Sequence, residues 1–140
     1  MLANNEGCAV FGLPASIFTS PKSYIEAVRQ GLPGQTVKAA VDEFGDRDLF
    51  IRILNTTAPN LHRFYSKKSL GPEESEILLD ALRLIFEANR VWGGQKSAKQ
   101  WLSSPVPALD GERPKDLFDT FEGRRWITTV LRHIETGDFS

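Results

Sequence analysis

The chain has 140 residues, which is enough for one domain or for two small ones that share a core. Hydrophobic residues make up 41% of the chain and charged residues 25%, a composition that supports a packed core and excludes wholesale disorder. The net charge of -1 does not indicate a nucleic-acid partner, so evidence for one has to come from a local basic patch.

Cys8 is the single cysteine, so an internal disulfide and a multi-cysteine zinc site are both excluded. No apolar run reaches the ~18–20 residues of a membrane span, and the N-terminus lacks the basic region of a signal peptide. We therefore expect a cytoplasmic protein. Residues 1–20 show no clear period and contain Gly7, Gly12 and Pro14, which predicts an irregular N-terminal arm of unknown role.

Helix signals follow one another from residue 20 onward. Ser20 before Pro21 predicts the start of a helix, and Gly31 predicts its end. A second helix, ended by Gly45, is indicated by apolar residues at the i, i+3, i+4, i+7 spacing of one buried face: Val37, Ala40, Val41 and Phe44.

Two short helices are predicted between residues 46 and 67, the first capped by Asp46 and the second following a turn at residues 55–57. These are the dimensions of a helix-turn-helix. Between residues 46 and 69, five basic residues against two acidic ones give a local charge of +3. The predicted DNA-contacting residues share the outward face of the second helix and its C-terminal end: Thr57, Asn60, His62, Arg63, Ser66, Lys67 and Lys68. The alternative is an ordinary solvated face, because any short basic helix presents such side chains.

The longest predicted helix covers residues 72–92, with Pro72 and two carboxylates in its first turn. Its polar residues form one narrow stripe and apolar residues fill almost all the rest. A helix of this kind is buried on more than one side. We therefore predict a homodimer in which part of this helix lies near the interface.

The C-terminal part is predicted to contain a short helix at residues 96–102, a proline-rich loop at 103–111 and a last helix at 119–136. Asp119 and Glu122 form a capping-box-like pair at the start of that last helix, and Gly137 ends it. Trp101 and Leu109 are expected to close a small C-terminal core. No segment alternates with period two for long enough to indicate a sheet, so the predicted fold is all-α.

Catalytic and metal-binding patterns are missing from the sequence. His62 and His133 lie far apart, and no cysteine or carboxylate cluster has the spacing of metal ligands. Neither a phosphate-binding glycine loop nor a nucleophile elbow is present. We expect a protein that is not an enzyme and that needs no metal and no cofactor.

The second half carries a series of motifs in a family-specific order. They are Leu70-Gly71-Pro72-Glu73-Glu74-Ser75-Glu76, Trp101-Leu102, residues 105–114 from Pro105 to Pro114, Phe118-Asp119-Thr120, Glu122-Gly123 and residues 131–137. With them the chain resembles, over about residues 31–140, the antitoxins of the Xre/MbcA/ParS type. The resemblance implies a cognate RES-domain toxin that depletes NAD, a C-terminal domain that covers the toxin's active-site entrance, and a complex that represses its own promoter.

This resemblance implies a DNA-binding helix-turn-helix region at residues 21–70 and a toxin-binding domain at residues 71–140. Arginines and aromatics dominate the energetics of protein interfaces. The predicted toxin-contacting residues are four arginines of the C-terminal domain and the tail beyond Gly137: Arg113, Arg124, Arg125, Arg132, Asp138, Phe139 and Ser140.

Two other functions fit the same residues. One is a free-standing helix-turn-helix transcriptional regulator without a toxin partner, and the other is a structural adaptor that does not bind DNA. A RES-type reading frame next to the gene would distinguish the antitoxin from both.

Overall fold

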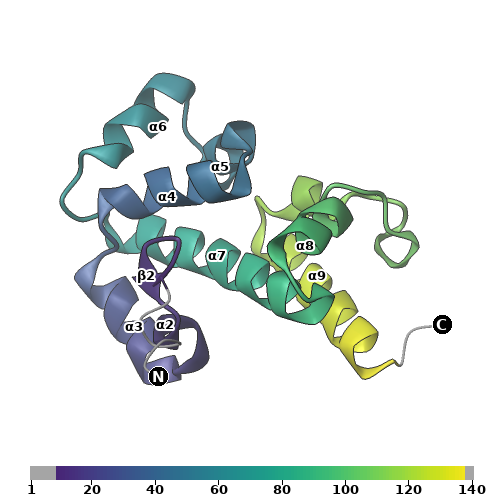
Figure 1. Ribbon diagram of the computed structural model, residues 1–140. Helices are drawn as coiled ribbons and strands as arrows, with labels where there is room; N and C mark the ends of the chain where they lie inside the picture. The colour runs from purple at the N-terminus through teal and green to yellow at the C-terminus, as the bar shows by residue number, and fades with distance from the viewer. Residues whose placement is uncertain (1–8, 138–140) are drawn as a thin grey trace. The chain divides into compact units, whose positions relative to one another are not determined.

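The computed structural model describes residues 9–137 and is built from helices, which confirms the predicted all-α fold (Figure 1). A two-stranded antiparallel pair, β1 (Ala9–Val10) and β2 (Leu13–Pro14), precedes them. The helices in chain order are α2 (Ser16–Thr19), α3 (Pro21–Gln30), α4 (Gly34–Phe44), α5 (Arg47–Ile53), α6 (Ala58–Tyr65), α7 (Pro72–Trp92), α8 (Gln95–Leu102) and α9 (Phe121–Thr136). Two 3₁₀ turns, η1 (Pro107–Leu109) and η2 (Pro114–Leu117), lie in the proline-rich stretch before α9.

The helix starts follow the capping residues of the sequence. The side chains of Ser20, Asp46 and Thr57 accept hydrogen bonds from the backbone N–H three residues on, at 3.2, 3.1 and 3.3 Å. These bonds satisfy N–H groups that have no partner inside the helix. Gly45 and Gly137 end α4 and α9 in the left-handed conformation, as predicted.

The start of α9 differs from the prediction. Thr120, not Asp119, is the N-cap, and its hydroxyl accepts from Gly123 N at 2.9 Å. The helix therefore begins at Phe121. Thr120 has the extended backbone that an N-cap requires, and it follows closely after the 3₁₀ turn η2.

The predicted irregular arm is wrong for residues 9–20. The turn between β1 and β2 has positive φ at Phe11 and Gly12, and α2 follows directly. Phe11, Leu13 and Phe18 are buried, and Phe11 N donates to Glu43 Oε1 of α4 at 3.2 Å. A two-residue turn followed by one helical turn is too short to show a period, so the sequence pattern missed it. Residues 1–8 lie outside the described residues.

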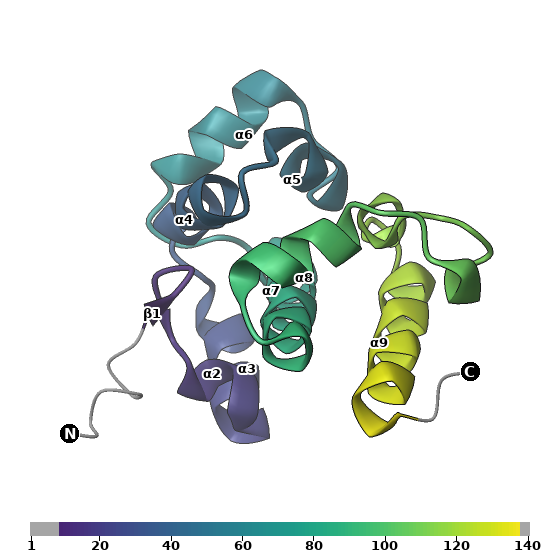
Figure 2. The same ribbon diagram turned by 45° about the vertical axis from the view of Figure 1, so that its right-hand side comes forward.

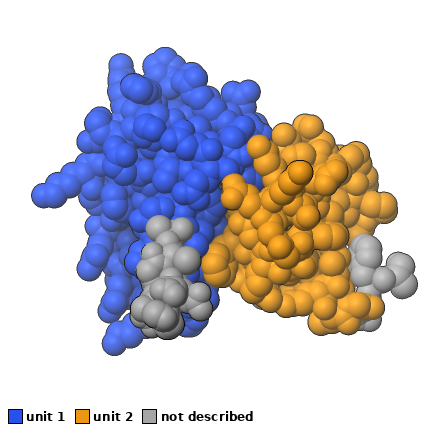
Figure 3. Space-filling view, in the orientation of Figure 1, with its two compact units in different colours: residues 1–82 blue, residues 83–140 orange. Residues whose placement is uncertain are grey.

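The chain divides into two compact units, residues 1–82 and residues 83–140, with the division inside α7 (Figure 3). The functional boundary at residues 70 and 71 stays a prediction. In the first unit, α4, α5 and α6 pack together, and Figures 1 and 2 both show them as one group. The fully buried side chains of this group include Val37, Phe50 and Leu61.

The second unit has a core of its own. Leu102, Leu109, Phe118 and Ile127 are fully buried, so they join α8, the two 3₁₀ turns and α9 around one set of apolar side chains. The Trp101 ring lies 5.8 Å from that of Trp92 and is half-buried. The structure thus confirms the core position predicted for Leu109, whereas Trp101 is only partly covered.

The apolar surface of α7 is mostly buried within the chain itself. Seven of its apolar side chains are buried: Leu78, Leu79, Ala81, Leu82, Leu84, Ile85 and Ala88. Ile77 is the large apolar side chain of α7 that remains exposed, at 36%. The homodimer was predicted because α7 has more apolar surface than one small core can bury. In the structure, Ile77 is the exposed apolar side chain of α7 that still supports this prediction. Within residues 9–137, none of the helices has the length and hydropathy of a membrane span.

Candidate interaction sites

The first candidate site is the outer surface of α6. The turn from Leu54 to Thr57 joins α5 to α6 and contains Asn55 with a φ of 50°. Leu61 and Phe64 are buried, so they anchor the inner face of α6 to the α4–α5–α6 group. This leaves the opposite face of α6 at the surface of the first unit.

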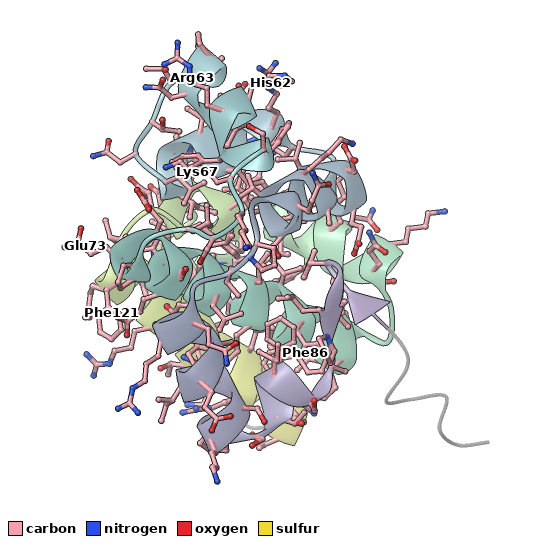
Figure 4. The ribbon with its side chains drawn as sticks, turned by 90° about the vertical axis from the view of Figure 1, so that its left-hand side faces the viewer. His62, Arg63, Lys67, Glu73, Phe86 and Phe121 are labelled. Carbon is pink, nitrogen blue, oxygen red and sulfur yellow. The ribbon has the colours of Figure 1, made fainter. Side chains whose placement is uncertain are left out.

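All seven predicted DNA-contacting residues are exposed in the structure: Thr57, Asn60, His62, Arg63, Ser66, Lys67 and Lys68. Figure 4 shows His62, Arg63 and Lys67 on this surface. Thr57 also caps the helix, so its hydroxyl already has a backbone partner. The other six predicted residues do not cap the start of α6.

The polar side chains of α6 are ordered by their neighbours. Arg63 Nη1 donates to Asn60 Oδ1 at 2.8 Å, which holds the guanidinium along the helix surface. Lys67 Nζ lies 4.7 Å from the centre of the Phe64 ring, in a cation–π contact. The His62 and Tyr65 rings are 5.3 Å apart. Arg63 keeps donors that Asn60 does not use, and these can reach base edges or phosphates.

The C-terminal end of α6 is held against the start of α4. Gly34 N donates to the Lys67 carbonyl at 2.9 Å, and Gln35 Nε2 donates to the Tyr65 carbonyl at 3.0 Å. A Cβ atom on Gly34 would lie 2.0 Å from the Phe64 carbonyl oxygen, so glycine permits this close approach. The position of α6 is therefore set by α4 as well as by the turn from α5.

The second candidate site is the surface of α9 in the second unit. The start of α9 is pressed against η2, because a Cβ on Gly123 would lie 2.0 Å from the Leu117 carbonyl oxygen. Arg124 is only 7% exposed, and its Nη1 donates to the Phe118 carbonyl at 2.7 Å. These contacts make the first turn of α9 a closely packed part of the unit.

An ion-pair network joins α7 to α9. The Arg90 guanidinium pairs with Glu135 of α9 and with Glu87, whose Oε1 lies 2.7 Å from Arg90 Nη2. The hydrogen bond from Arg90 holds the pKa of the Glu135 carboxyl below its usual value. Beside this network lies a hollow of about 80 Å³, which Arg132 and Thr128 also line.

The structure places the predicted toxin-contacting arginines differently from one another. Arg113 and Arg125 are exposed and form ion pairs with Asp116 at 2.8 Å and with Glu122 at 3.2 Å. Arg132 is exposed. Arg124 departs from the expectation of a surface residue, because its side chain turns inward to the Phe118 carbonyl. Asp138, Phe139 and Ser140 lie outside the described residues.

Sequence reasoning missed Phe121, the first residue of α9, whose side chain is 65% exposed. Phe121 stands off the buried stripe of α9, which runs through Ile127, Val130 and Leu131. An aromatic residue beside the N-cap and four residues before Arg125 was the signal that could have found it. Among residues 9–137, no group of histidine, cysteine and carboxylate side chains is placed to hold a metal ion.

Comparison with known proteins finds similarity to antitoxins, with a family match inside the second unit. Residues 87–137 match the family described as "Antitoxin Xre/MbcA/ParS C-terminal toxin-binding domain". The chain is 28% identical over 149 residues to the "Prs ADP-ribosylating antitoxin" of Sphingobium sp. (strain YBL2), covering 99% of this chain and 94% of that protein. It is 33% identical over 70 residues to "Antitoxin Xre" of Yersinia enterocolitica serotype O:8 / biotype 1B (strain NCTC 13174 / 8081), covering 49% of this chain and 47% of that protein.

Proposed function

We propose that this chain is an antitoxin of the Xre/MbcA/ParS type whose C-terminal part binds and silences an NAD-consuming toxin of the RES-domain class. The observation that carries the proposal is the position of the toxin-binding match. Residues 87–137 lie wholly within the second compact unit, which has its own buried core. A domain with its own core can present a rigid surface to a partner.

The expected chemistry of the toxin follows from its substrate. The name of the Sphingobium relative mentions ADP-ribosylation, a reaction in which NAD donates its ADP-ribose group. A toxin that admits NAD needs a deep polar cleft, and an antitoxin that occupies the mouth of the cleft stops turnover. The NAD chemistry then belongs to the toxin, and this chain contributes binding alone.

The proposed contact residues are the exposed arginines Arg113, Arg125 and Arg132 together with the tail Asp138, Phe139 and Ser140. Guanidinium groups pair well with carboxylates around a cleft because their planar donors match the carboxylate geometry. Arg113 and Arg125 already pair with exposed carboxylates of this chain. Exposed ion pairs of this kind contribute little to stability, so exchanging them for partner carboxylates has a small energetic cost.

The test is co-expression of the full chain with the protein encoded by the neighbouring reading frame. We expect cellular NAD to fall with that protein alone and to be preserved with the antitoxin. Removing residues 138–140 should weaken protection more than it weakens folding, which circular dichroism checks separately. Mass spectrometry of cellular proteins distinguishes ADP-ribosylation from simple NAD breakdown. Unchanged NAD and no complex between the two proteins would contradict the proposal.

We also propose that the α6 surface binds operator DNA and that the module represses its own promoter. The supporting observation is that Asn60 and Arg63 are exposed on α6 and that Lys67 is exposed two residues beyond its C-terminal end. Lys67→Ala should weaken binding uniformly across sequences and flatten its salt dependence, as loss of a phosphate contact does. Arg63→Ala should cost ~1–3 kcal/mol if the guanidinium pairs with a guanine.

A gel-shift assay on the promoter of the module checks both variants. Variants that bind like the wild type would remove α6 from the interface. DNA binding by a chain that forms no complex with the protein of the neighbouring reading frame would instead favour the free-standing regulator.

A homodimer remains part of the proposal, with the exposed Ile77 on α7 near the contact. Light scattering at micromolar concentration without toxin tests it. A strict monomer would contradict it.

A further inference from the structure

Resting on the proposed function, we propose that Phe121 is the apolar anchor of the toxin interface. Its ring is inferred to enter an apolar socket on the toxin, and carboxylates at the rim of the socket are inferred to face Arg125 and Arg132. This assigns the centre of the contact to the start of α9.

The first observation is the exposure of the Phe121 ring (Figure 4). Of the large apolar side chains that the structure describes in the second unit, Phe121 alone is exposed, at 65%. Phe118, three residues earlier, is fully buried in the core of the same unit. Phe118 is therefore part of the core of the unit, whereas Phe121 lies at its surface. The surface ring lies within the segment that matches a toxin-binding domain.

The second observation is the rigid mounting of this ring. The Thr120 hydroxyl accepts from Gly123 N at 2.9 Å, and Gly123 lies against the Leu117 carbonyl. One residue further on, the buried Arg124 side chain donates to the Phe118 carbonyl at 2.7 Å. The backbone on both sides of Phe121 is thus held before any partner arrives. A side chain displayed on an ordered backbone loses little conformational entropy on binding, which favours affinity.

The third observation is the charge along the same side of α9. Phe121, Arg125, Thr128 and Arg132 recur at i, i+4, i+7 and i+11, the spacing of one helical stripe. Arg125 pairs with Glu122 at 3.2 Å, and both side chains are largely exposed, so the pair can be exchanged. Arg132 forms no ion pair with any described residue. An apolar end followed by cations fits an acidic partner surface with an apolar socket.

The experiment measures the affinity of the full chain for the toxin encoded beside it, by titration calorimetry or surface plasmon resonance. Phe121→Ala should raise Kd at least tenfold, which corresponds to about 1.4 kcal/mol. Phe121→Leu should keep part of the affinity because it keeps an apolar group for the socket. Arg132→Ala should mainly lower the association rate, with the largest effect at low salt.

The matched control is Ile25→Ala on α3, which removes an apolar side chain that is 46% exposed in the first unit, outside the toxin-binding match. It should leave Kd unchanged. Circular dichroism and urea unfolding should show that Phe121→Ala folds like the wild type, because the ring makes little contact with the core. A folded Phe121→Ala variant with wild-type Kd, or an equal loss with Ile25→Ala, would overturn the anchor while leaving the proposed function intact. A wild-type chain that does not bind the toxin would overturn the proposed function and the anchor together.

Discussion

Arg124 and Arg125 are neighbours with opposite surroundings. The Arg124 guanidinium is buried and bonded to the Phe118 carbonyl, whereas the Arg125 side chain is 67% exposed and pairs with Glu122. Hydrogen bonds that involve a charged group contribute more than neutral ones, and burying an arginine also covers apolar surface with its stem. Arg124 is therefore a positioning residue for the first turn of α9.

We expect Arg124→Met to lower the free energy of unfolding by ~1–3 kcal/mol, because a charged buried hydrogen bond is lost. The matched variant Arg125→Met should change stability by less than ~0.5 kcal/mol, as surface substitutions do. Urea unfolding followed by circular dichroism measures both. Equal effects of the two variants would show that the Arg124 contact does not stabilise the unit.

Glu135 gives a prediction for pH. Arg90 lowers the pKa of the Glu135 carboxyl in the folded chain, so the pair stabilises the fold at pH values above the ordinary carboxyl pKa. This stabilisation is lost as the pH falls through the lowered pKa. Glu135→Gln should therefore lower Tm at neutral pH, and the difference from wild type should shrink as the pH falls below roughly 4.

The control for this variant is Glu122→Gln, which removes the more exposed pair with Arg125 at 3.2 Å. It should change Tm little at either pH. A Glu135→Gln variant with the same Tm as wild type at neutral pH would show that the link between α7 and α9 does not stabilise the unit.

At the scale of elements, the contact between α4 and α6 depends on the absence of a side chain at Gly34. The Cβ of an alanine there would meet the Phe64 carbonyl at 2.0 Å and the Lys67 carbonyl at 2.6 Å. Both atoms belong to the backbone of α6 and its C-terminal end, so the clash can be relieved only by moving the backbones of α4 and α6 apart. The surface proposed to bind DNA is thus positioned by a residue outside it.

Gly34→Ala should destabilise the first unit by ~1–3 kcal/mol, because overpacking outweighs the ~1 kcal/mol by which alanine favours a helix over glycine. Gln35→Ala, in the same turn, loses one exposed hydrogen bond to the Tyr65 carbonyl and should have a smaller effect. Thermal unfolding compares the two variants. A Gly34→Ala variant at least as stable as wild type would mean that α6 is free to shift.

For the whole molecule, we predict that residues 71–140 bind and silence the toxin without residues 1–70. Removing the first 70 residues uncovers apolar side chains at the start of α7, among them Leu78 and Leu79, and breaks the bond from Leu32 N to Ser75 Oγ at 2.9 Å. The fragment should therefore be less stable than the full chain. Its toxin affinity should stay within about tenfold, or about 1.4 kcal/mol, because the fragment contains all of the matched residues 87–137.

Binding of the purified fragment and NAD in co-expressing cells are the two measurements. Circular dichroism first establishes that the fragment is folded. A folded fragment that neither binds the toxin nor preserves NAD would contradict this division of the chain.

The sequence by itself determined most of the helices and several of their ends, although it missed α2 and placed the cap of α9 one residue early. Caps such as Ser20 and Asp46, the glycines at positions 45 and 137, and the apolar spacing of α4 act over a few residues, so local sequence is enough to predict them. The core position of Leu109 followed in the same way. For the predicted DNA-contacting residues, exposure also followed from the face of one helix.

Tertiary structure alone decided which side chains of α9 are covered. Arg124 is buried and Phe121 is exposed, the reverse of what their polarity suggests, because η2 packs against one side of the helix start and leaves the other side open. Likewise, the hydrogen bond from Phe11 N to Glu43 of α4 holds the turn at Phe11 and Gly12. No hydrophobic period in residues 9–20 predicts this turn. Burial depends on which distant element covers a given face, and a pattern read along one helix carries no information about that neighbour.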